Sequence, residues 1–242
     1  MEIKGLVKTS LIEWPGKISA VIFVSGCNFR CPFCHNSHLV DLKKIAKLPS
    51  LSEKQIITDL KKRRKWIEGV VITGGEPSLQ ADLPEFLGKL KKLGFETMIE
   101  TNGGRPELVQ KLVTCKPAIL DFLSLDFKAP LDRHYAKTVG LKNFDPKIWI
   151  KSLQAILSSG IPFELRTTIV PGIHDKKTLV KMARQLKKII GRRKVTWFWQ
   201  NFQPKNCLNP EFEKIKPYKR EKLEEFLKTA KSYYSDVNLR TS

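Results

Sequence analysis

Three cysteines, Cys27, Cys31 and Cys34, fall within eight residues of the chain. They follow an apolar run, residues 18–24, that ends in Ser25-Gly26, so we expect them on a loop at the end of a buried strand. Three thiolates from one loop can hold a metal centre and leave one coordination position open. An open position is typical of a catalytic metal site, whereas a structural zinc site is closed by four protein ligands.

A structural zinc site is the plain alternative, with His35 or His38 as the fourth ligand. Zinc sites usually contain two pairs of closely spaced ligands, and no second cysteine pair accompanies this triplet. Cys115 and Cys207 stand alone, and we expect Cys115 to be a small buried residue at a helix end. An odd number of cysteines with three clustered favours metal binding in a reducing compartment over a disulfide framework.

Polar residues also follow other apolar runs. Thr73-Gly74-Gly75-Glu76 ends the run GVVIT, and Pro77 comes next. Two glycines allow a ligand to approach the backbone closely, and a carboxylate beside them could hold an ammonium group. A plain turn between strand and helix would account for the glycines and the proline without any ligand.

Three further candidates have weaker individual signals. Thr101-Asn102-Gly103 ends another run, although Asn-Gly is also an ordinary turn. Asp126 and Lys128 are two residues apart in a strand-like segment, so they face the same side. Such a pair either binds a ligand or forms a salt bridge at the rim, and the sequence leaves both open. For Arg166 too, the sequence leaves open a ligand contact or a salt bridge.

The elements that position these residues alternate regularly, strand after helix. The expected strands are residues 18–24, 69–73, 95–100, 122–127, 162–170 and 194–199. The expected helices are residues 52–66, 82–93, 106–114, 145–159, 175–190 and 217–233. Residues 3–12 are interpreted as a short mixed segment and residues 237–240 as a small extra strand.

Alternating strand and helix units predict a parallel sheet with right-handed crossovers. Six strands fall short of the eight that close a full barrel, so we predict an α/β fold, an open partial (β/α)6 TIM-like barrel. A doubly wound open sheet is the alternative. We expect a single domain over residues 1–242, with the barrel core at about residues 17–205 and a C-terminal helix and short strand in residues 206–242. In either architecture ligands bind at the C-terminal ends of the strands, where the polar segments fall.

The formal net charge of the chain is +20. The lysines and arginines are spread over several predicted helices, and no basic motif with interleaved aromatic residues appears. We therefore expect a lysine-rich surface and no nucleic-acid partner. The chain has no apolar run of about 18 residues and no signal-peptide pattern, so we expect no membrane contact and a cytoplasmic location.

The spacing of the three cysteines, with Phe33 before the last one, resembles the signature of the radical S-adenosylmethionine superfamily. The resemblance implies that Cys27, Cys31 and Cys34 hold a [4Fe-4S] cluster whose free iron takes S-adenosyl-L-methionine. It also implies that the Gly-Gly-Glu-Pro motif contacts the amino group of that cofactor. The cofactor-binding residues predicted in this way are Phe33, Thr73, Gly74, Gly75, Glu76, Thr101, Asn102, Asp126, Lys128 and Arg166.

Within the superfamily, the chain resembles the activating enzymes of glycyl-radical enzymes, and most closely those of anaerobic ribonucleoside-triphosphate reductase. It is also similar to pyruvate formate-lyase activating enzymes. The segments that carry the resemblance lie within about residues 1–205 and include Trp14-Pro15-Gly16, residues 26–36 and residues 166–172. At the end of the last strand, Gln200-Asn201 stands where lyase activators carry a histidine, so a role for that strand end is not implied.

The resemblance implies reductive cleavage of S-adenosylmethionine to a 5′-deoxyadenosyl radical. The implied partners are a glycyl-radical enzyme, which supplies a glycine Cα hydrogen, and a low-potential ferredoxin or flavodoxin, which supplies the electron. Two alternatives stay open. One is a radical S-adenosylmethionine enzyme acting on a small molecule or RNA. The other is a zinc-bound module that binds nucleic acid.

Overall fold

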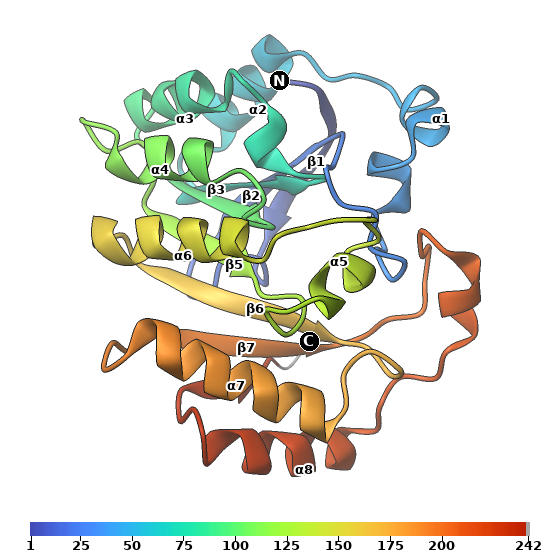
Figure 1. Cartoon of the computed structure of the whole chain (residues 1–242). Coiled ribbons are helices and arrows are strands. Elements are labelled where there is room, and N and C mark those ends of the chain that lie inside the picture. The colour runs from blue at the N-terminus through green and yellow to red at the C-terminus, as the bar shows by residue number, and fades with distance from the viewer. Residues whose placement is uncertain (241–242) are drawn as a thin grey trace.

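The computed structural model describes residues 1–240, which fold around one curved sheet of eight strands (Figure 1). The strands lie side by side in sequence order. All neighbouring pairs are parallel except β1 and β2, which are antiparallel. The strands are β1 (Ile3–Ser10), β2 (Ser19–Val24), β3 (Gly69–Gly74), β4 (Glu96–Thr101), β5 (Phe122–Asp126), β6 (Phe163–Ile169), β7 (Thr196–Asn201) and β8 (Val237–Leu239).

Helices connect the parallel strands, and side chains cap the first turns of two long ones. Ser52 and Gln55 form a capping box, and the Asp175 side chain accepts a hydrogen bond from the Thr178 N–H. The helices are α1 (Leu42–Ile45), α2 (Glu53–Arg63), α3 (Leu83–Lys92), α4 (Pro106–Thr114), α5 (His134–Thr138), α6 (Lys147–Ser159), α7 (Lys176–Ile190) and α8 (Arg220–Lys231). Three short 3₁₀ segments are η1 (Ser37–Leu39), η2 (Pro77–Leu79) and η3 (Pro210–Lys214).

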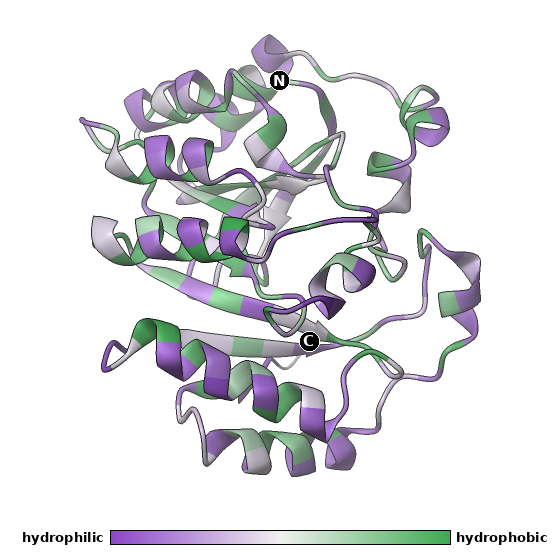
Figure 2. Ribbon diagram, viewed as in Figure 1, coloured by the Kyte–Doolittle hydropathy of each residue, from purple (hydrophilic) through white to green (hydrophobic). Residues whose placement is uncertain are grey.

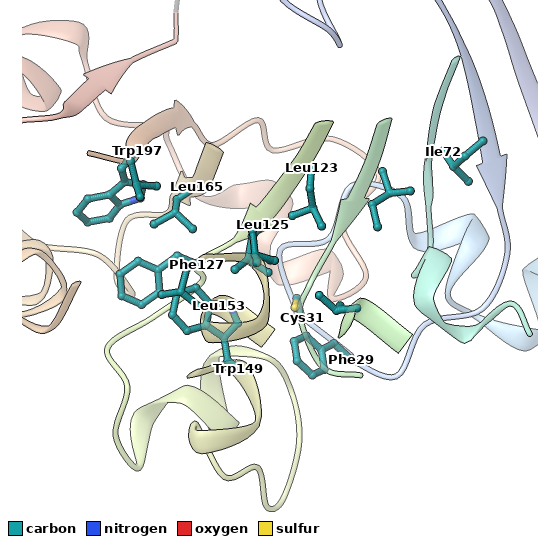
Figure 3. Close-up of a cluster of buried hydrophobic side chains, with 14 of the residues drawn as sticks. Phe29, Cys31, Ile72, Leu123, Leu125, Phe127, Trp149, Leu153, Leu165 and Trp197 are labelled. Atoms are coloured by element: carbon teal, nitrogen blue, oxygen red, sulfur yellow. The ribbon is translucent and has the colours of Figure 1, made fainter. Parts of the chain in front are cut away.

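The two faces of the sheet differ in character because successive strand residues point to opposite sides. The outer face packs against the helices through buried apolar side chains such as Ile72, Leu123 and Trp197 (Figure 3). The covering helices carry green and purple segments in Figure 2, as amphipathic helices do. The inner face has a small apolar cluster around Trp14 and Met98. Polar side chains follow this cluster toward the C-terminal strand ends.

The structure confirms the open partial barrel. Strands β2 to β7 are the six expected strands, and a helix follows each of them. A doubly wound sheet reverses its strand order and has helices on both faces, whereas this sheet keeps sequence order throughout. Within residues 1–240 the sheet does not close, because β1 and β8 are its two edges.

Two local predictions were incomplete. Residues 3–10 form an edge strand, β1, with two register irregularities against β2, although their mixed polar and apolar residues do not alternate cleanly. Pairing with β2 decides this conformation, and the side chains of Val7, Lys8 and Thr9 remain exposed. The short helices α1 and α5 lie in segments that the sequence periodicity left as loops. No helix of the described chain is long and apolar enough to cross a membrane.

We predict that Trp197→Ala lowers the free energy of unfolding by about 3–5 kcal/mol. The Trp197 side chain is fully buried, and its Nε1–H donates to the Thr167 hydroxyl at 2.9 Å. The control is Trp66→Ala, because Trp66 is 67% exposed, and this change should stay within about 0.5 kcal/mol. Urea unfolding followed by circular dichroism measures both, and equal losses would contradict this description of the core.

Candidate metal centre

The three clustered cysteines lie on a loop, residues 25–36, that leaves the C-terminal end of β2. Cys31 is buried, and Cys27 and Cys34 are half-buried. Hydrogen bonds within the loop fix its course. The Cys34 N–H donates to the Cys31 carbonyl at 3.0 Å, and the Phe29 N–H points at the Cys27 sulfur at 3.3 Å. The structure therefore presents all three thiols from one ordered turn, as the sequence predicts.

Burial controls the protonation of these thiols. It raises the pKa of Cys27 and Cys31 to about 12 and raises the pKa of Cys34, because a thiolate is poorly solvated there. The Lys128 ammonium opposes this effect and lowers the pKa of all three thiols. The single positive charge of Lys128 therefore favours the thiolate form of all three cysteines. A metal centre that binds here must displace the thiol protons, so its binding is coupled to proton release.

The donor set suits a cluster better than a single ion. Among residues 1–240, no group of three or more His, Cys, Asp or Glu side chains is arranged to hold one metal ion. His35 and His38, the candidate fourth ligands of a zinc site, have exposed side chains. Three soft thiolates on one loop fit an iron–sulfur cluster with one open iron.

The segment after β4 meets the cysteine loop, as the sequence predicts. The Asn102 side-chain amide donates to the Asn28 side chain at 2.8 Å and lies 3.7 Å from the Cys27 sulfur. The loop is also held from the side of α5, because the Arg30 N–H donates to the Val139 carbonyl at 2.8 Å. Helix α5, absent from the sequence-based expectations, thus supports the cysteine turn.

Gly74, the last residue of β3, and Gly75 pack closely against the backbone of residues 23–26. The Gly75 N–H donates to the Val24 carbonyl at 2.8 Å, and the Glu76 N–H donates to the Gly26 carbonyl at 2.7 Å. A Cβ atom at Gly75 would lie 2.0 Å from the Gly26 oxygen. The sequence suggested that the glycines leave room for a ligand, but the chain's own backbone fills this side. Contact of a ligand with their remaining backbone groups stays a prediction.

Glu76 joins the ends of β3 and β4. Its carboxylate is fully buried and accepts hydrogen bonds from the Thr101 hydroxyl at 2.6 Å, the Asn102 N–H at 2.7 Å and the Ser78 N–H at 2.9 Å. Burial raises the pKa of Glu76, whereas these donors lower it. Both carboxylate oxygens have protein donors, so an ammonium group would be a further partner. Thr101 and Asn102 are brought together with Glu76 as the sequence predicts, whereas the Thr73 hydroxyl bonds to Glu100.

Asp126 and Lys128 form the ion pair that the sequence left open, with 2.8 Å between the Lys128 nitrogen and the carboxylate. The backbone of Lys128 is held by His174, which the sequence-based site did not include. Nε2 of His174 lies 3.0 Å from the Lys128 carbonyl, and Nδ1 accepts from the Val170 N–H at 3.0 Å. These partners assign the neutral tautomer with the proton on Nε2. No sequence feature separates this buried histidine from an exposed loop residue.

Arg166 lies within β6 on the inner face, with its side chain directed at two carboxylates. It forms ion pairs with Glu100 and Glu164, and its guanidinium also donates to the Glu13 carbonyl at 3.1 Å. The Thr73 hydroxyl donates to Glu100 at 2.7 Å. Thr73 and Arg166 are therefore joined through Glu100, which the sequence placed at a strand end without assigning it a role.

The segment after β7 covers part of the cysteine loop. The Asn209 N–H donates to the Pro32 carbonyl at 2.9 Å, and the rings of Phe33 and Phe212 lie 6.5 Å apart. Phe33 is buried by these contacts. The Asn201 side chain donates to the Tyr218 carbonyl at 2.8 Å, so it supports the C-terminal segment.

Comparisons with known proteins agree with this arrangement. Residues 21–186 match the model of the Radical SAM superfamily. The chain is 32% identical over 244 residues to a Methanocaldococcus jannaschii protein named as a candidate glycyl-radical enzyme activating enzyme, covering 99% of this chain and 95% of the relative. It is 29% identical over 248 residues to the pyruvate formate-lyase-activating enzyme of Clostridium pasteurianum, covering 93% of this chain and 96% of that enzyme.

Solved structures share the fold at low sequence identity. QueE from Escherichia coli has a TM-score of 0.59 and 16% identity, covering 100% of this chain and 94% of that chain. Streptococcus suis SuiB bound to S-adenosylmethionine has a TM-score of 0.62 and 19% identity, covering 92% of this chain and 49% of that chain. At these identities the likeness shows the fold alone.

We predict that Gly75→Ala destabilises the protein by about 1–3 kcal/mol, because the added methyl group overlaps the Gly26 oxygen. Gly88→Ala is the matched control. Gly88 lies inside α3, and a Cβ atom there makes an ordinary contact with Ile119 at 3.9 Å. The control should stabilise the protein by about 0.5–1 kcal/mol, because alanine favours a helix interior. Equal effects of the two changes in urea unfolding would contradict the tight packing of Gly75.

We also predict that His174 makes stability depend on pH. Its pKa is lowered from 6.5 to about 4 by burial, so the unfolded chain takes up a proton first as the pH falls. The contribution of His174 is complete above pH 6.5 and is lost between pH 6.5 and 4. Between pH 7 and pH 5, the wild type should lose about 2 kcal/mol more stability than His174→Gln. Identical pH dependence of the two proteins in urea unfolding would refute this role.

Proposed function

The chain belongs to the Radical SAM superfamily, and within it we propose that the protein is an activating enzyme that generates a glycyl radical on a partner protein. Anaerobic ribonucleoside-triphosphate reductase is the partner class that we propose. The observation that carries the proposal is the cysteine triplet at the mouth of a partial barrel whose full length aligns with activating enzymes. Support for an activating enzyme comes from relatives that align over almost their whole length, and not from the shared fold alone.

The protein uses a [4Fe-4S] cluster and S-adenosylmethionine, as its superfamily does. We propose that Cys27, Cys31 and Cys34 hold the cluster. When bound, the two cofactors supply one-electron cleavage of the sulfonium and a 5′-deoxyadenosyl radical that abstracts hydrogen. The Lys128 ammonium offsets the negative charge that the thiolates bring into a buried site. Helix α5 and the segment after β7 hold the turn in place and cover it.

The proposed S-adenosylmethionine contacts are the polar strand ends around this turn. Glu76, Thr101 and Asn102 are already joined in one hydrogen-bonded unit beside Cys27. Thr73 and Arg166 meet through Glu100 on the inner face. Gly74, Gly75, Phe33, Asp126 and Lys128 complete the proposed set. Such a preassembled site orients a cofactor without reorganisation at the moment of reaction.

We propose an acidic ferredoxin or flavodoxin as the electron donor and a reducing, cytoplasmic environment. Support comes from the formal net charge of +20 and from the exposed lysines of α1, Lys43 and Lys44, which follow the cysteine loop closely. Complementary charge raises the rate at which such partners meet. The five cysteines are free thiols in the described chain, as expected in a reducing compartment.

We predict that Cys31→Ala abolishes reductive cleavage of S-adenosylmethionine after anaerobic reconstitution with iron and sulfide. The control is Cys115→Ala, which removes a half-buried thiol at the end of α4, and it should retain wild-type activity. The products 5′-deoxyadenosine and methionine are measured by chromatography. Cleavage that survives Cys31→Ala would show that this cysteine does not hold the cluster.

The activating role is tested with a candidate partner. The reconstituted enzyme, a reductant and S-adenosylmethionine are incubated anaerobically with an anaerobic ribonucleotide reductase encoded in the same genome. Electron paramagnetic resonance should then detect a glycyl radical on the reductase. Cleavage of S-adenosylmethionine with no radical on such a partner would favour a small-molecule or RNA substrate instead.

A further inference from the structure

Arg240 follows β8, the last described strand, and reaches the inner face of the sheet. Its N–H donates to the Trp199 carbonyl at 2.9 Å, which fixes its backbone beside β7. Its guanidinium lies over the Phe198 ring, 4.5 Å from the centroid. The same group donates to both oxygens of Glu164, at 2.9 and 2.8 Å. Strand β8 thus carries a cation into the partial barrel.

This contact is one end of a line of charges that crosses the inner face. Arg240 pairs with Glu164, Glu164 pairs with Arg166, and Arg166 pairs with Glu100. Glu100 in turn accepts the hydrogen bond from Thr73 at the end of β3. The side chains of Glu164 and Arg166 are 4% and 7% exposed, so neither charge can rely on water.

The balance of charges depends on Arg240. Two carboxylates, Glu100 and Glu164, face two guanidinium groups in this line. Glu13 lies close by, and its pKa is raised by burial and by Glu100, whereas Arg166 and Arg240 oppose this rise. Without Arg240, one arginine would face both carboxylates of the line. Glu164, two residues from Arg166 in the same strand, would then compete with Glu100 for its guanidinium.

We propose that Arg240 is a positioning residue for the S-adenosylmethionine site. By neutralising Glu164, it leaves Arg166 to hold Glu100 against Thr73, beside the Thr101 and Asn102 contacts at the end of β4. The proposal rests on the proposed function, because it takes the ends of β3, β4 and β6 as the cofactor site. It gives the appended strand β8 a role in function as well as in covering the edge of β7.

The test separates charge balance from simple docking of β8. The variants are Arg240→Gln, Arg240→Lys, Glu164→Gln and the double variant Glu164→Gln/Arg240→Gln. Each is reconstituted, and the dissociation constant of S-adenosylmethionine is measured by equilibrium dialysis on the oxidised enzyme, where no turnover occurs. The absorption of the cluster and the melting temperature are recorded for each variant.

We expect Arg240→Gln to weaken S-adenosylmethionine binding about tenfold, because the coupled charges of one network rarely act independently. Arg240→Lys should weaken it less, since the charge is kept and the two-point contact is lost. In the Glu164→Gln background, Arg240→Gln should change the dissociation constant by less than about threefold. This rescue is the signature of charge balance, because docking of β8 would be impaired in both backgrounds.

Wild-type binding by Arg240→Gln would overturn the inference, and so would a double variant as weak as Arg240→Gln. If Arg240→Gln does not fold, Arg240→Lys is compared in the wild-type and Glu164→Gln backgrounds instead, and equal effects in both would overturn the inference. A wild-type enzyme that assembles its cluster but does not bind S-adenosylmethionine would overturn the proposed function and this inference together. Failure of the inference alone is therefore recognisable, because wild-type binding is then intact.

Discussion

The site depends on placing one buried and two half-buried thiols near one ammonium group. Burial disfavours the thiolates that a cluster needs, and the Lys128 charge opposes that effect at all three positions. The half-buried lysine must therefore be held in place near the thiols. Asp126 holds its ammonium, and the fully buried His174 holds its carbonyl. His174 thereby joins the end of β5 to the end of β6, and this joint positions the lysine on which the proposed chemistry rests.

The sheet brings the other polar residues of the proposed site to the same end as the cysteine turn. Because strands β2 to β8 run parallel in sequence order, their C-terminal ends lie at the same edge of the sheet although they are far apart in the chain. Glu76 bonds across the ends of β3 and β4, while the line from Arg240 to Thr73 crosses the inner face below them. Hydrogen bonds stabilise the Glu76 carboxylate, whereas opposite charges pair in the line from Arg240 to Glu100. Both keep polar groups satisfied in places that water does not reach freely.

The sequence predicted the features that depend on local spacing. The cysteine triplet, the six strands and the long helices between them each have a pattern within one segment. It did not predict the partners of Arg166, because Glu100 lies 66 residues away and is chosen by strand register. His174 and β1 were missed for the same reason, since tertiary pairing rather than local pattern decides them. The sequence identified Gly74 and Gly75 as part of a motif, but their tight contact with the backbone of residues 23–26 appears only in the folded structure.

In the proposed reaction, a hydrogen atom passes from a glycine Cα of a partner protein to the adenosyl group of the cofactor. The most direct measurement uses an anaerobic ribonucleotide reductase labelled with deuterium at its glycine Cα positions. The reduced enzyme and S-adenosylmethionine are added, and the 5′-deoxyadenosine is analysed by mass spectrometry. The account predicts one deuterium atom in this product, formed together with the glycyl radical. Unlabelled 5′-deoxyadenosine formed in the presence of the labelled partner would contradict it.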